Sequence, residues 1–325
     1  MKTIEVKKYD ANLKESWDSF VDKAKNATFL FRRDFMDYHK HRFEDYSLMV
    51  FEGKKLMAVL PANIVGNSVF SHQGLSYGGL VLQREVYFSQ VVDIFRAVLL
   101  FLENDRKENL HLKLLPHIYH KVPSEEIEYL LFILKAKLER CDTAAVIDYR
   151  HRLEIKSSNR LRGIKKAIKN KLQIKEEVNF EDFWSEVLIP NLKRAHRASP
   201  VHTVEEIDKL RKNFPENIRQ FNVYSGTEIL GGTTIFETNE VAHVQYISAT
   251  EAGRNMGALD LLYEVLIDNF SQKKYFTFGI SNEDQGQKVN KGLLHWKETF
   301  GARTVTHSFY KVETKNHPLL NAIYV

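Results

Sequence analysis

The sequence has little of several features that define whole classes of protein. Cys141 is the single cysteine among 325 residues, so no internal disulfide can form. Seven prolines and 15 glycines are too few for a disordered or fibrous chain. The N-terminal stretch lacks the apolar core of a signal peptide, and the longest run without a charged residue, 56–83, is too polar to span a membrane. These absences predict a cytoplasmic protein.

The composition is that of a folded chain with a modest basic excess. Hydrophobic residues make up 43% and charged residues 27%, and the formal net charge is +5. A chain of this length exceeds the size at which one hydrophobic core usually stops growing, so we expect two domains, residues 1–150 and 151–325. The basic charge favours anionic partners without requiring a nucleic acid, and we expect no DNA partner.

Basic residues are concentrated in the stretch 150–175, which carries ten Lys and Arg against one acid, Glu154. Apolar residues recur within it at spacings of three and four, which predicts an amphipathic helix over 158–172 at the junction of the two domains. Its cationic face is either the solvated side of a linking helix or an electropositive wall beside an anionic ligand.

Two segments of similar pattern flank this helix. Residues 49–62 and 222–235 each contain an alternating strand, a turn centred on Gly53 or Gly226, and a second strand. Each is followed by another strand (67–76 or 240–248), a long helix, a strand, a helix and a closing strand. The repetition predicts an α/β protein with mixed α+β sheets, built from two copies of one unit.

In the second copy, a strand over 241–248 leads into a passage that contains two glycines. Alternation places Ala242, Val244 and Tyr246 on a core-like face, and His243 and Gln245 on the other face.

The passage itself, "SATEAGRNMG", ends at residue 257, and we expect a helix beyond it. Gly253 and Gly257 would let the backbone approach a ligand closely, and the free N–H groups and dipole of the helix would attract an anion. Arg254 could add a charge-assisted contact. The alternative is a plain helix entry with a glycine turn.

The order of strand, "GRNMGA" turn, helix, strand "YFTFGIS", helix and strand resembles the GNAT acyltransferase fold. The diagnostic turn of that fold, Gln/Arg-x-x-Gly-x-Gly/Ala, cradles the pyrophosphate of acyl-coenzyme A. Here Arg254 and Gly257 match it, and Leu259 takes the last small position. The resemblance implies that a donor coenzyme such as acetyl-CoA contacts Gly253, Arg254, Asn255, Met256, Gly257 and Ala258. It also implies that the strand backbone at Tyr246, Ile247 and Ser248 supplies the oxyanion donor.

Two such units joined by "RGIKKAIK" (162–169), with "WKETFG" at 296–301, resemble more specifically the Fem group of peptidyltransferases and its acyltransferase relatives. This resemblance covers nearly the whole chain, but no heptad insertion matches the coiled-coil arm of some Fem proteins. Fem proteins use aminoacyl-tRNA as donor, which is therefore an alternative partner. The second motif implies that Lys297 contacts the acceptor or stabilises the transition state; an exposed helix lysine is the other interpretation.

The N-terminal copy has no glycine at the corresponding helix mouth, where the chain runs through residues 83–85. We therefore place the donor in the C-terminal unit and the acceptor in the N-terminal one, with Arg32, Arg33 and Tyr77 as candidate contacts. Tyr77 fits a core aromatic as well.

Transfer of an acyl group to an amine needs a positioned donor, hydrogen bonds to the developing oxyanion, and a proton acceptor. His243 suits the last role because the reference pKa of histidine is about 6.5, although a histidine in a strand is often only structural. Gln245 is a candidate acceptor contact. Glu283 is a substrate contact or an alternative base, Asp284 is an alternative base, and a turn suits both.

Other catalytic motifs are absent from the sequence. There is no nucleophile elbow, P-loop or His-Glu-x-x-His zinc motif, and "HIYH" at 117–120 lacks further ligands nearby, so we expect no metal. The sequence predicts a soluble acyltransferase that moves an acyl group, preferably acetyl, from acyl-CoA to an amine of a small or cell-envelope-precursor metabolite. The alternatives are aminoacyl-tRNA-dependent transfer and a non-catalytic binder of RNA or another anionic ligand.

Overall fold

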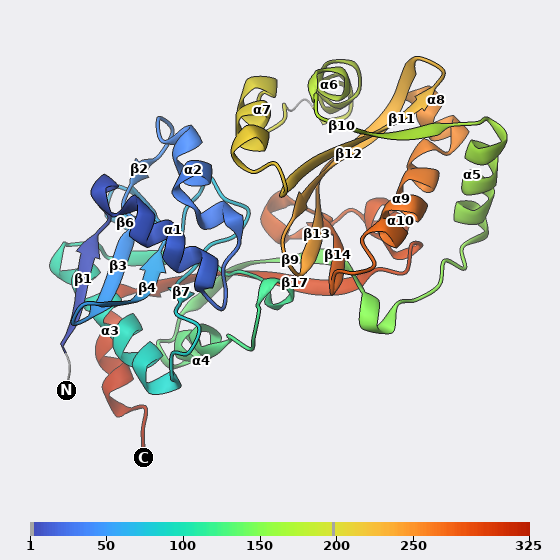
Figure 1. Ribbon diagram of the computed structural model, residues 1–325. Helices are drawn as coiled ribbons and strands as arrows, with labels where there is room; N and C mark the ends of the chain where they lie inside the picture. The colour runs from blue at the N-terminus through green and yellow to red at the C-terminus, as the bar shows by residue number, and fades with distance from the viewer. Residues whose placement is uncertain (1–2, 197–198) are drawn as a thin grey trace. The chain divides into compact units, whose positions relative to one another are not determined.

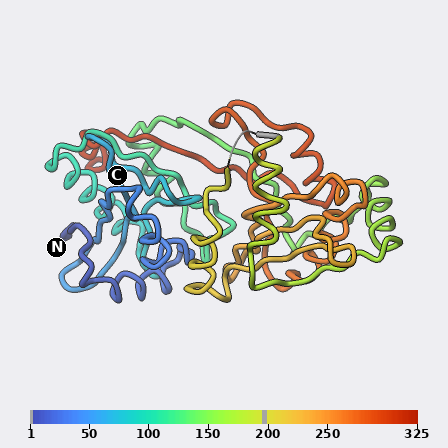
Figure 2. Tube along the Cα trace, turned by 90° about the horizontal axis from the view of Figure 1, so that it is seen from above, coloured from blue at the N-terminus to red at the C-terminus, as the bar shows by residue number. Residues whose placement is uncertain are grey.

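A computed structural model describes residues 3–196 and 199–325 of the protein. The chain divides into two compact units (Figures 1 and 2). Unit 1 comprises Met1–Asp142 and Thr306–Val325, and unit 2 comprises Thr143–Val305. Both combine sheets with helices, as the repeated sequence pattern predicted.

Unit 1 contains two sheets and a long apolar helix. One sheet has the antiparallel order β1-β3-β4-β7, and strands of a second follow the order β17-β8-β6-β5-β2, in which β6 and β8 are parallel. Buried residues of α3, from Val91 to Leu102, pack in one core with both sheets. The elements are β1 (Ile4–Lys8), α1 (Lys14–Lys23), α2 (Arg33–Met36), β2 (Glu44–Asp45), β3 (Leu48–Glu52), β4 (Lys55–Leu60), β5 (Asn63–Val65), β6 (Ser68–Phe70), β7 (Val81–Leu82), α3 (Phe88–Asn104), β8 (Asn109–Lys113) and α4 (Glu126–Ile133).

Unit 2 is built around the strand order β10-β11-β12-β13-β14-β9. Helix α9 packs its buried residues, including Leu262, Tyr263 and Leu266, in one core with residues of these strands. The elements of unit 2 are α5 (Ser158–Lys169), β10 (Gln173–Glu177), a π-helical turn (Phe183–Leu188), α6 (Ile189–His196), α7 (Val204–Asn213), β11 (Ile218–Ser225), β12 (Glu228–Glu237), β13 (Val241–Ala249), α8 (Glu251–Met256), α9 (Ala258–Asn269), β14 (Tyr275–Ile280), β15 (Asn282–Glu283), β16 (Lys288–Val289) and α10 (Lys291–Glu298). Strands β9 (Lys137–Asp148) and β17 (Arg303–Glu313) each contain a boundary between the units, after Asp142 and after Val305.

The first hairpin of each copy turns in the same way. Gly53 follows β3 with φ 60°, and Gly226 follows β11 with φ 61°, each as the first residue of a two-residue turn. A positive φ at this position suits glycine and the twist of a tight hairpin. The equivalent turns support the internal repeat read from the sequence.

The closing strands are exchanged between the two copies. Residues 146–148 of β9, which close the first copy in sequence, pair with Tyr275–Thr277 of β14 in unit 2. Residues 309–313 of β17, which close the second copy, pair with β8 in unit 1. The units therefore differ from the predicted division at residue 150, because the C-terminal segment returns to unit 1. A strand pattern shows which face is buried but does not specify a partner strand far away in the sequence.

One predicted helix is shorter than expected. It is the second helix expected in the first copy, whose apolar pattern runs over residues 123–140, whereas α4 ends at Ile133 and β9 begins at Lys137. Lys135 between them has φ 55°, a left-handed conformation that stops a right-handed helix.

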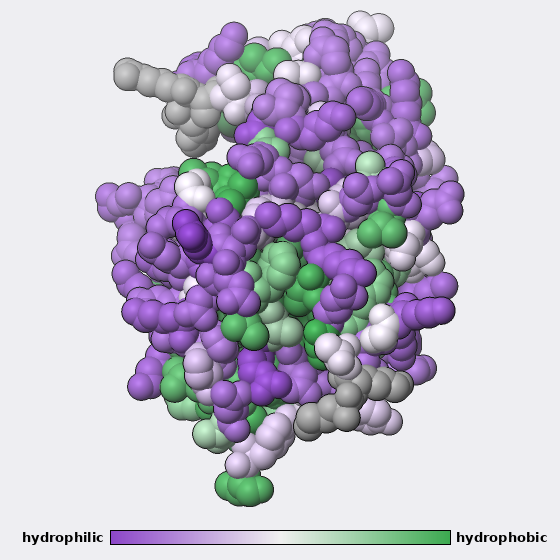
Figure 3. Space-filling view, turned by 90° about the vertical axis from the view of Figure 1, so that its left-hand side faces the viewer, coloured by the Kyte–Doolittle hydropathy of each residue, from purple (hydrophilic) through white to green (hydrophobic). Residues whose placement is uncertain are grey.

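Within the described residues, no helix is both long and apolar enough to cross a membrane. The face of the molecule in Figure 3 is mostly hydrophilic, with smaller hydrophobic areas between the polar side chains.

Candidate active site

A β-bulge interrupts β13 in the middle of unit 2. Thr234 of β12 pairs with Tyr246 and Ile235 pairs with Val244, so Gln245 is an extra residue in β13. A bulge reverses the alternation of side chains beyond it. Ala242 and Val244 therefore lie in the core, as predicted. The same prediction is wrong for Tyr246, whose ring lies against the Trp184 ring with 5.1 Å between the ring centroids.

Strands β13 and β14 pair only over their first halves. The parallel ladder joins residues 241–243 to residues 275–277, whereas β13 continues to Ala249 and β14 to Ile280. Beyond the ladder, Val244–Ser248 face Phe278–Ile280 without strand pairing; we call this opening the β13–β14 notch. Along this opening, the edge of β13 that faces β14 has backbone N–H and C=O groups that pair with no other strand of the described residues.

Lys297 of α10 anchors one side of the notch. Its Nζ donates to the carbonyl oxygens of Gly279 (3.1 Å) and Ile280 (2.6 Å), and the residue is 3% exposed. An ammonium group has three N–H donors. Two of them bond to these carbonyl oxygens of the described residues, so one N–H is left for a ligand. Burial lowers the pKa of Lys297 to about 8.

His243 is the last residue of β13 in the parallel ladder and lies close to Gly279 and Lys297. A Cβ placed on Gly279 would be 3.5 Å from the His243 ring, which shows how closely the ring approaches β14. Burial, and secondarily the charge of Lys297, lower the pKa of His243 to about 4. At neutral pH the imidazole is therefore uncharged and the Lys297 ammonium is mostly charged. The structure brings together these two residues, which lie 54 positions apart in the sequence.

Gln245 at the bulge and Tyr246 directly after it lie together. The Tyr246 hydroxyl and His202 Nδ1 are 2.5 Å apart, and the Gln245 side chain also hydrogen-bonds Tyr246. Burial, the largest cause, raises the pKa of Tyr246 to about 12. The Tyr246 side chain is therefore neutral at physiological pH.

A cavity of about 530 Å³ adjoins the far end of β13. Ile247 and Ser248 of the notch also line this cavity, which we call the β13 cavity. Arg194 and Arg254 bring two positive charges and Glu251 one negative charge, so its lining favours an anion. Its lining residues are Asn191, Leu192, Arg194, Ile247, Ser248, Ala249, Glu251, Arg254, Leu259, Leu293 and Trp296.

Hydrogen bonds hold the end of β13 in place. Asn191 Nδ2 donates to Ser248 Oγ (2.7 Å) and to the Ala249 carbonyl (2.6 Å), and Arg254 Nη1 donates to the same carbonyl (2.7 Å). Ile247, Ser248 and Arg254 were predicted to contact the acyl donor. All three line the β13 cavity.

The glycine passage is helical rather than an open turn. Helix α8 begins at Glu251, and its N-cap Thr250 accepts a hydrogen bond from the Gly253 N–H. A Cβ on Gly253 would lie 2.0 Å from the Leu230 carbonyl oxygen, so this glycine allows close packing of α8 on β12. The prediction of an irregular passage up to residue 257 was wrong, because the cap starts the helix seven residues earlier.

Gly257 and its neighbours pack against the basic helix α5, which lies beside α9 (Figures 1 and 2). Gly257 has φ 79°, and a Cβ there would meet the Gly163 carbonyl oxygen at 2.3 Å. Ala258 is buried, Met256 packs partly against the core, and Asn255 is exposed. Contact of Gly253, Asn255, Met256, Gly257 and Ala258 with a coenzyme stays a prediction; the structure gives both glycines a packing role.

The predicted acceptor contacts of unit 1 are held by protein groups. Arg33 is 3% exposed and donates to Asp37 (2.6 Å) and Asp45 (2.5 Å). Tyr77 is buried, donates to Thr28 Oγ1 (3.1 Å), and its pKa is raised by burial. Arg32 lies 3.8 Å from Asp22. Arg33 and Tyr77 therefore belong to the interior of unit 1, and a contact with the acceptor stays a prediction.

Glu283 is an exposed residue of unit 2 that accepts a hydrogen bond from Asn290 Nδ2 (2.9 Å). This contact joins the two sides of the short loop before α10. The structure places no catalytic partner on Glu283 among the described residues.

The counterpart of the notch in unit 1 is filled by the chain itself. Strands β6 and β8 pair over 68–70 and 109–111, as β13 and β14 do. Beyond them, Ser71 N–H donates to the His111 carbonyl (2.8 Å) and Gly78 N–H to the Lys113 carbonyl (2.6 Å). Gly78, at the end of the loop that follows β6, thus pairs beside the end of β8, where unit 2 leaves the corresponding edge open.

Two features of the site were not predicted from the sequence. The bulge at Gln245 leaves no mark in an unbroken alternating pattern. Gly279, with φ 68°, lies where β14 leaves the ladder, and a glycine within a strand pattern is a recognised sign of close backbone approach.

The two units and the notch define the class of the fold: the chain has a tandem GNAT-like fold. The solved structure of FemX is similar over 98% of this chain and 99% of that chain, with a TM-score of 0.67 and 10% identity. L-PGS from Bacillus licheniformis is similar over 96% and 94%, with a TM-score of 0.58 and 11% identity. A tandem GNAT protein from the clavulanic acid biosynthesis pathway is similar over 96% and 99%, with a TM-score of 0.55 and 10% identity. No family model and no curated protein matches the sequence.

Proposed function

We propose that the protein is an N-acyltransferase that binds an acyl-CoA donor in the β13–β14 notch of unit 2. The observation that carries this proposal is the open edge of β13 beside the buried Lys297 ammonium. The pantetheine arm of a coenzyme has amide groups that can pair with such an edge as a further strand would. The acyl carbonyl would then lie near a positive N–H donor.

The β13 cavity suits the rest of the donor. Its volume of about 530 Å³ lies within the range of about 300–1,000 Å³ that is usual for small-molecule sites. Arg194 and Arg254 can receive phosphate groups by charge-assisted hydrogen bonds. The cavity and the notch share Ile247 and Ser248, so one extended molecule can occupy both.

The proposed reaction needs one proton acceptor and one oxyanion donor. The amine of the acceptor attacks the thioester carbonyl, an amide C–N bond forms, the C–S bond breaks, and the thiol leaves with one proton released overall. Lys297 would stabilise the negative charge that develops on the carbonyl oxygen. His243, neutral at working pH, would take the proton of the incoming ammonium and pass it on to solvent, because an imidazole with a pKa of about 4 does not keep it. The acceptor is an amine of a small or cell-envelope-precursor metabolite.

A second candidate donor is aminoacyl-tRNA. It is favoured by the similarity to FemX and by the exposed basic face of α5, which includes Arg162, Lys165, Lys166 and Lys169. The aminoacyl ester would occupy the same notch, so the roles of Lys297 and His243 would be unchanged.

Thermal melts distinguish the donors. Acetyl-CoA at about 100 times its dissociation constant should stabilise the protein by about 2.7 kcal/mol, since it binds the folded chain and not the unfolded one. We expect a rise of a few degrees in melting temperature, and a smaller rise with adenosine 3′,5′-bisphosphate, which lacks the pantetheine arm. A shift with charged tRNA alone would replace the coenzyme by aminoacyl-tRNA, and no shift with any of the three would contradict the proposed function.

A further inference from the structure

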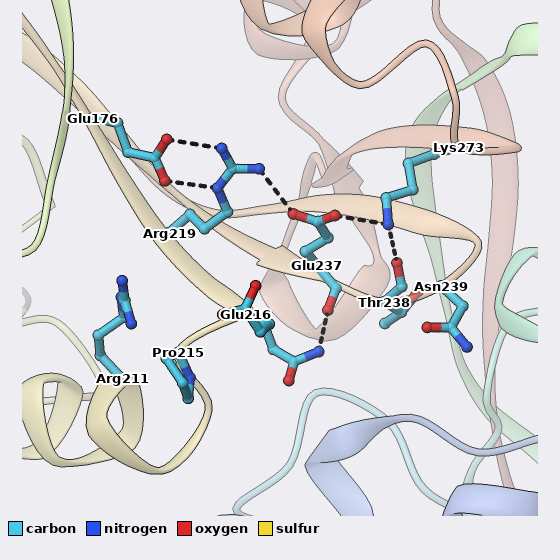
Figure 4. Close-up of a pocket in the computed structure, with 10 residues that line it drawn as sticks. Glu176, Arg211, Pro215, Glu216, Arg219, Glu237, Thr238, Asn239 and Lys273 are labelled. Atoms are coloured by element: carbon cyan, nitrogen blue, oxygen red, sulfur yellow. Dashed lines mark hydrogen bonds and ion pairs between the residues drawn. The ribbon is translucent and has the colours of Figure 1, made fainter.

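A second cavity, of about 520 Å³, lies at the opposite end of β13 from the β13 cavity. It is lined by the end of α7, the loop that follows it, the start of β11, the end of β12 and the turn before β13 (Figure 4). We call it the Arg211 cavity. It shares no residue with the notch. The lining residues are Glu176, Arg211, Pro215, Glu216, Asn217, Arg219, Glu237, Thr238, Asn239 and Lys273.

One wall of this cavity is a chain of alternating charges. Arg219 donates two hydrogen bonds to Glu176 (2.7 and 2.8 Å) and one to Glu237 (3.1 Å). Lys273 Nζ lies 2.7 Å from Glu237 and donates to the Thr238 carbonyl (2.8 Å). The side chains of Glu237 and Lys273 are 15% and 14% exposed. Two acids and two bases therefore neutralise one another in a fixed arrangement.

Arg211 lies across the cavity from Lys273 and Asn239, and none of the residues drawn in Figure 4 bonds its guanidinium. Its Nε is buried and has no hydrogen-bond partner among the described residues. Glu216, also on the lining, is exposed and takes part in no ion pair that the described residues show. Among the described residues, Arg211 and Glu216 are thus in no hydrogen bond or ion pair with this wall. The hydrogen bonds from Arg219 lower the pKa of Glu176, and Arg211, which acts on the wall only through its charge, helps to lower it.

We propose that the Arg211 cavity binds a small zwitterion of the α-amino acid type. The lining carries three basic and three acidic side chains, so a ligand of zero net charge suits it better than a simple anion or cation. The planar guanidinium of Arg211 receives the carboxylate by paired hydrogen bonds. The ammonium group of the ligand lies toward Glu216. The proposal does not depend on the reaction in the notch.

Ligand-observed NMR with each of the twenty amino acids, followed by calorimetry on those that bind, tests this site. We expect at least one amino acid to bind, with its N-acetyl and amide derivatives at least tenfold weaker because each lacks one charge. Arg211→Gln should weaken binding at least tenfold and Glu216→Gln should weaken it measurably. Lys212→Gln, an exposed neighbour on the same helix, should leave it unchanged.

The folded state of each variant is checked by its melting temperature, and Glu216→Gln serves if Arg211→Gln fails to fold. The proposal is overturned if no amino acid binds or if Arg211→Gln binds the amino acid as well as the unaltered protein does. It is also overturned if the N-acetyl and amide derivatives both bind as tightly as the free amino acid. Binding of inorganic phosphate in place of any amino acid would also overturn it. A failure here leaves the coenzyme melts unaffected.

Discussion

Lys297→Met is expected to lower turnover by about 10²- to 10³-fold, the usual loss when one donor to an oxyanion is removed. Methionine fills the buried space of the lysine stem but cannot donate to a carbonyl oxygen. Donor affinity should change little, because the notch and the β13 cavity are otherwise intact. The measurement is the steady-state rate of acyl transfer with acetyl-CoA, together with calorimetric donor affinity.

The matched control is Lys291→Met, which makes the same substitution at an exposed position of α10. It should retain full turnover. Lys297→Met also removes the donor to the Gly279 and Ile280 carbonyls, so some loss of stability is expected, and circular dichroism must confirm folding. Equal rates for the folded Lys297→Met variant and the control would remove Lys297 from the mechanism.

The pH dependence of kcat/KM shows whether Lys297 acts in its charged or its neutral form. Burial lowers its pKa to about 8, so the ammonium form is lost as pH rises through that value. If the charged form stabilises the oxyanion, kcat/KM falls above about pH 8, and this descending limb is absent from Lys297→Met. A rate that rises through pH 8 would instead show that the neutral amine is active, as a base.

His243→Gln is expected to lower turnover by roughly 10²-fold, the scale for losing a general base. Glutamine keeps hydrogen-bonding capacity but cannot take the proton. Donor affinity should be unchanged. His295→Gln, at an exposed position of α10, is the control. An unchanged rate in His243→Gln between pH 6 and pH 8 would assign the proton to water or another residue.

His243 should also make stability depend on pH. Its pKa is about 4 in the folded protein, against an ordinary value of 6.5, so the unfolded chain binds more protons between these two values. The free energy of unfolding therefore falls as pH drops from about 6.5 to about 4. This part of the pH dependence should disappear in His243→Gln and persist in His295→Gln.

The repeated units and most elements of unit 2 could be predicted from hydrophobic periodicity. The segment "YFTFGI" coincides with β14, and the apolar positions of "GALDLLYEVLIDNF" correspond to α9. These segments have strong patterns and lie deep in one core, so local preference and burial favour the same structure. The exchange of the closing strands could not be predicted, because it depends on pairing between distant segments.

The site was predictable only in part. His243 and Lys297 were proposed separately, and the structure brings them together. The burial of Lys297 has no local signal, since a lysine between Trp296 and Glu298 on a helix also fits an exposed position. The helix α8 was missed because Gly253 disfavours a helix by about 1 kcal/mol, whereas close packing against Leu230 requires this residue. Arg33 is held by carboxylates from two other positions, Asp37 and Asp45, which no motif indicated.

Hydrogen–deuterium exchange with and without acetyl-CoA shows whether an acyl-CoA donor binds in the β13–β14 notch of unit 2, as we propose. Slower exchange is predicted at residues 244–254 and 278–280, where the open edge and the cavity would be covered. Residues 70–78 of unit 1, where the chain fills its own notch, should not change. Protection confined to unit 1, or no protection at either edge of the notch under saturating acetyl-CoA, would show that the donor does not bind in the notch.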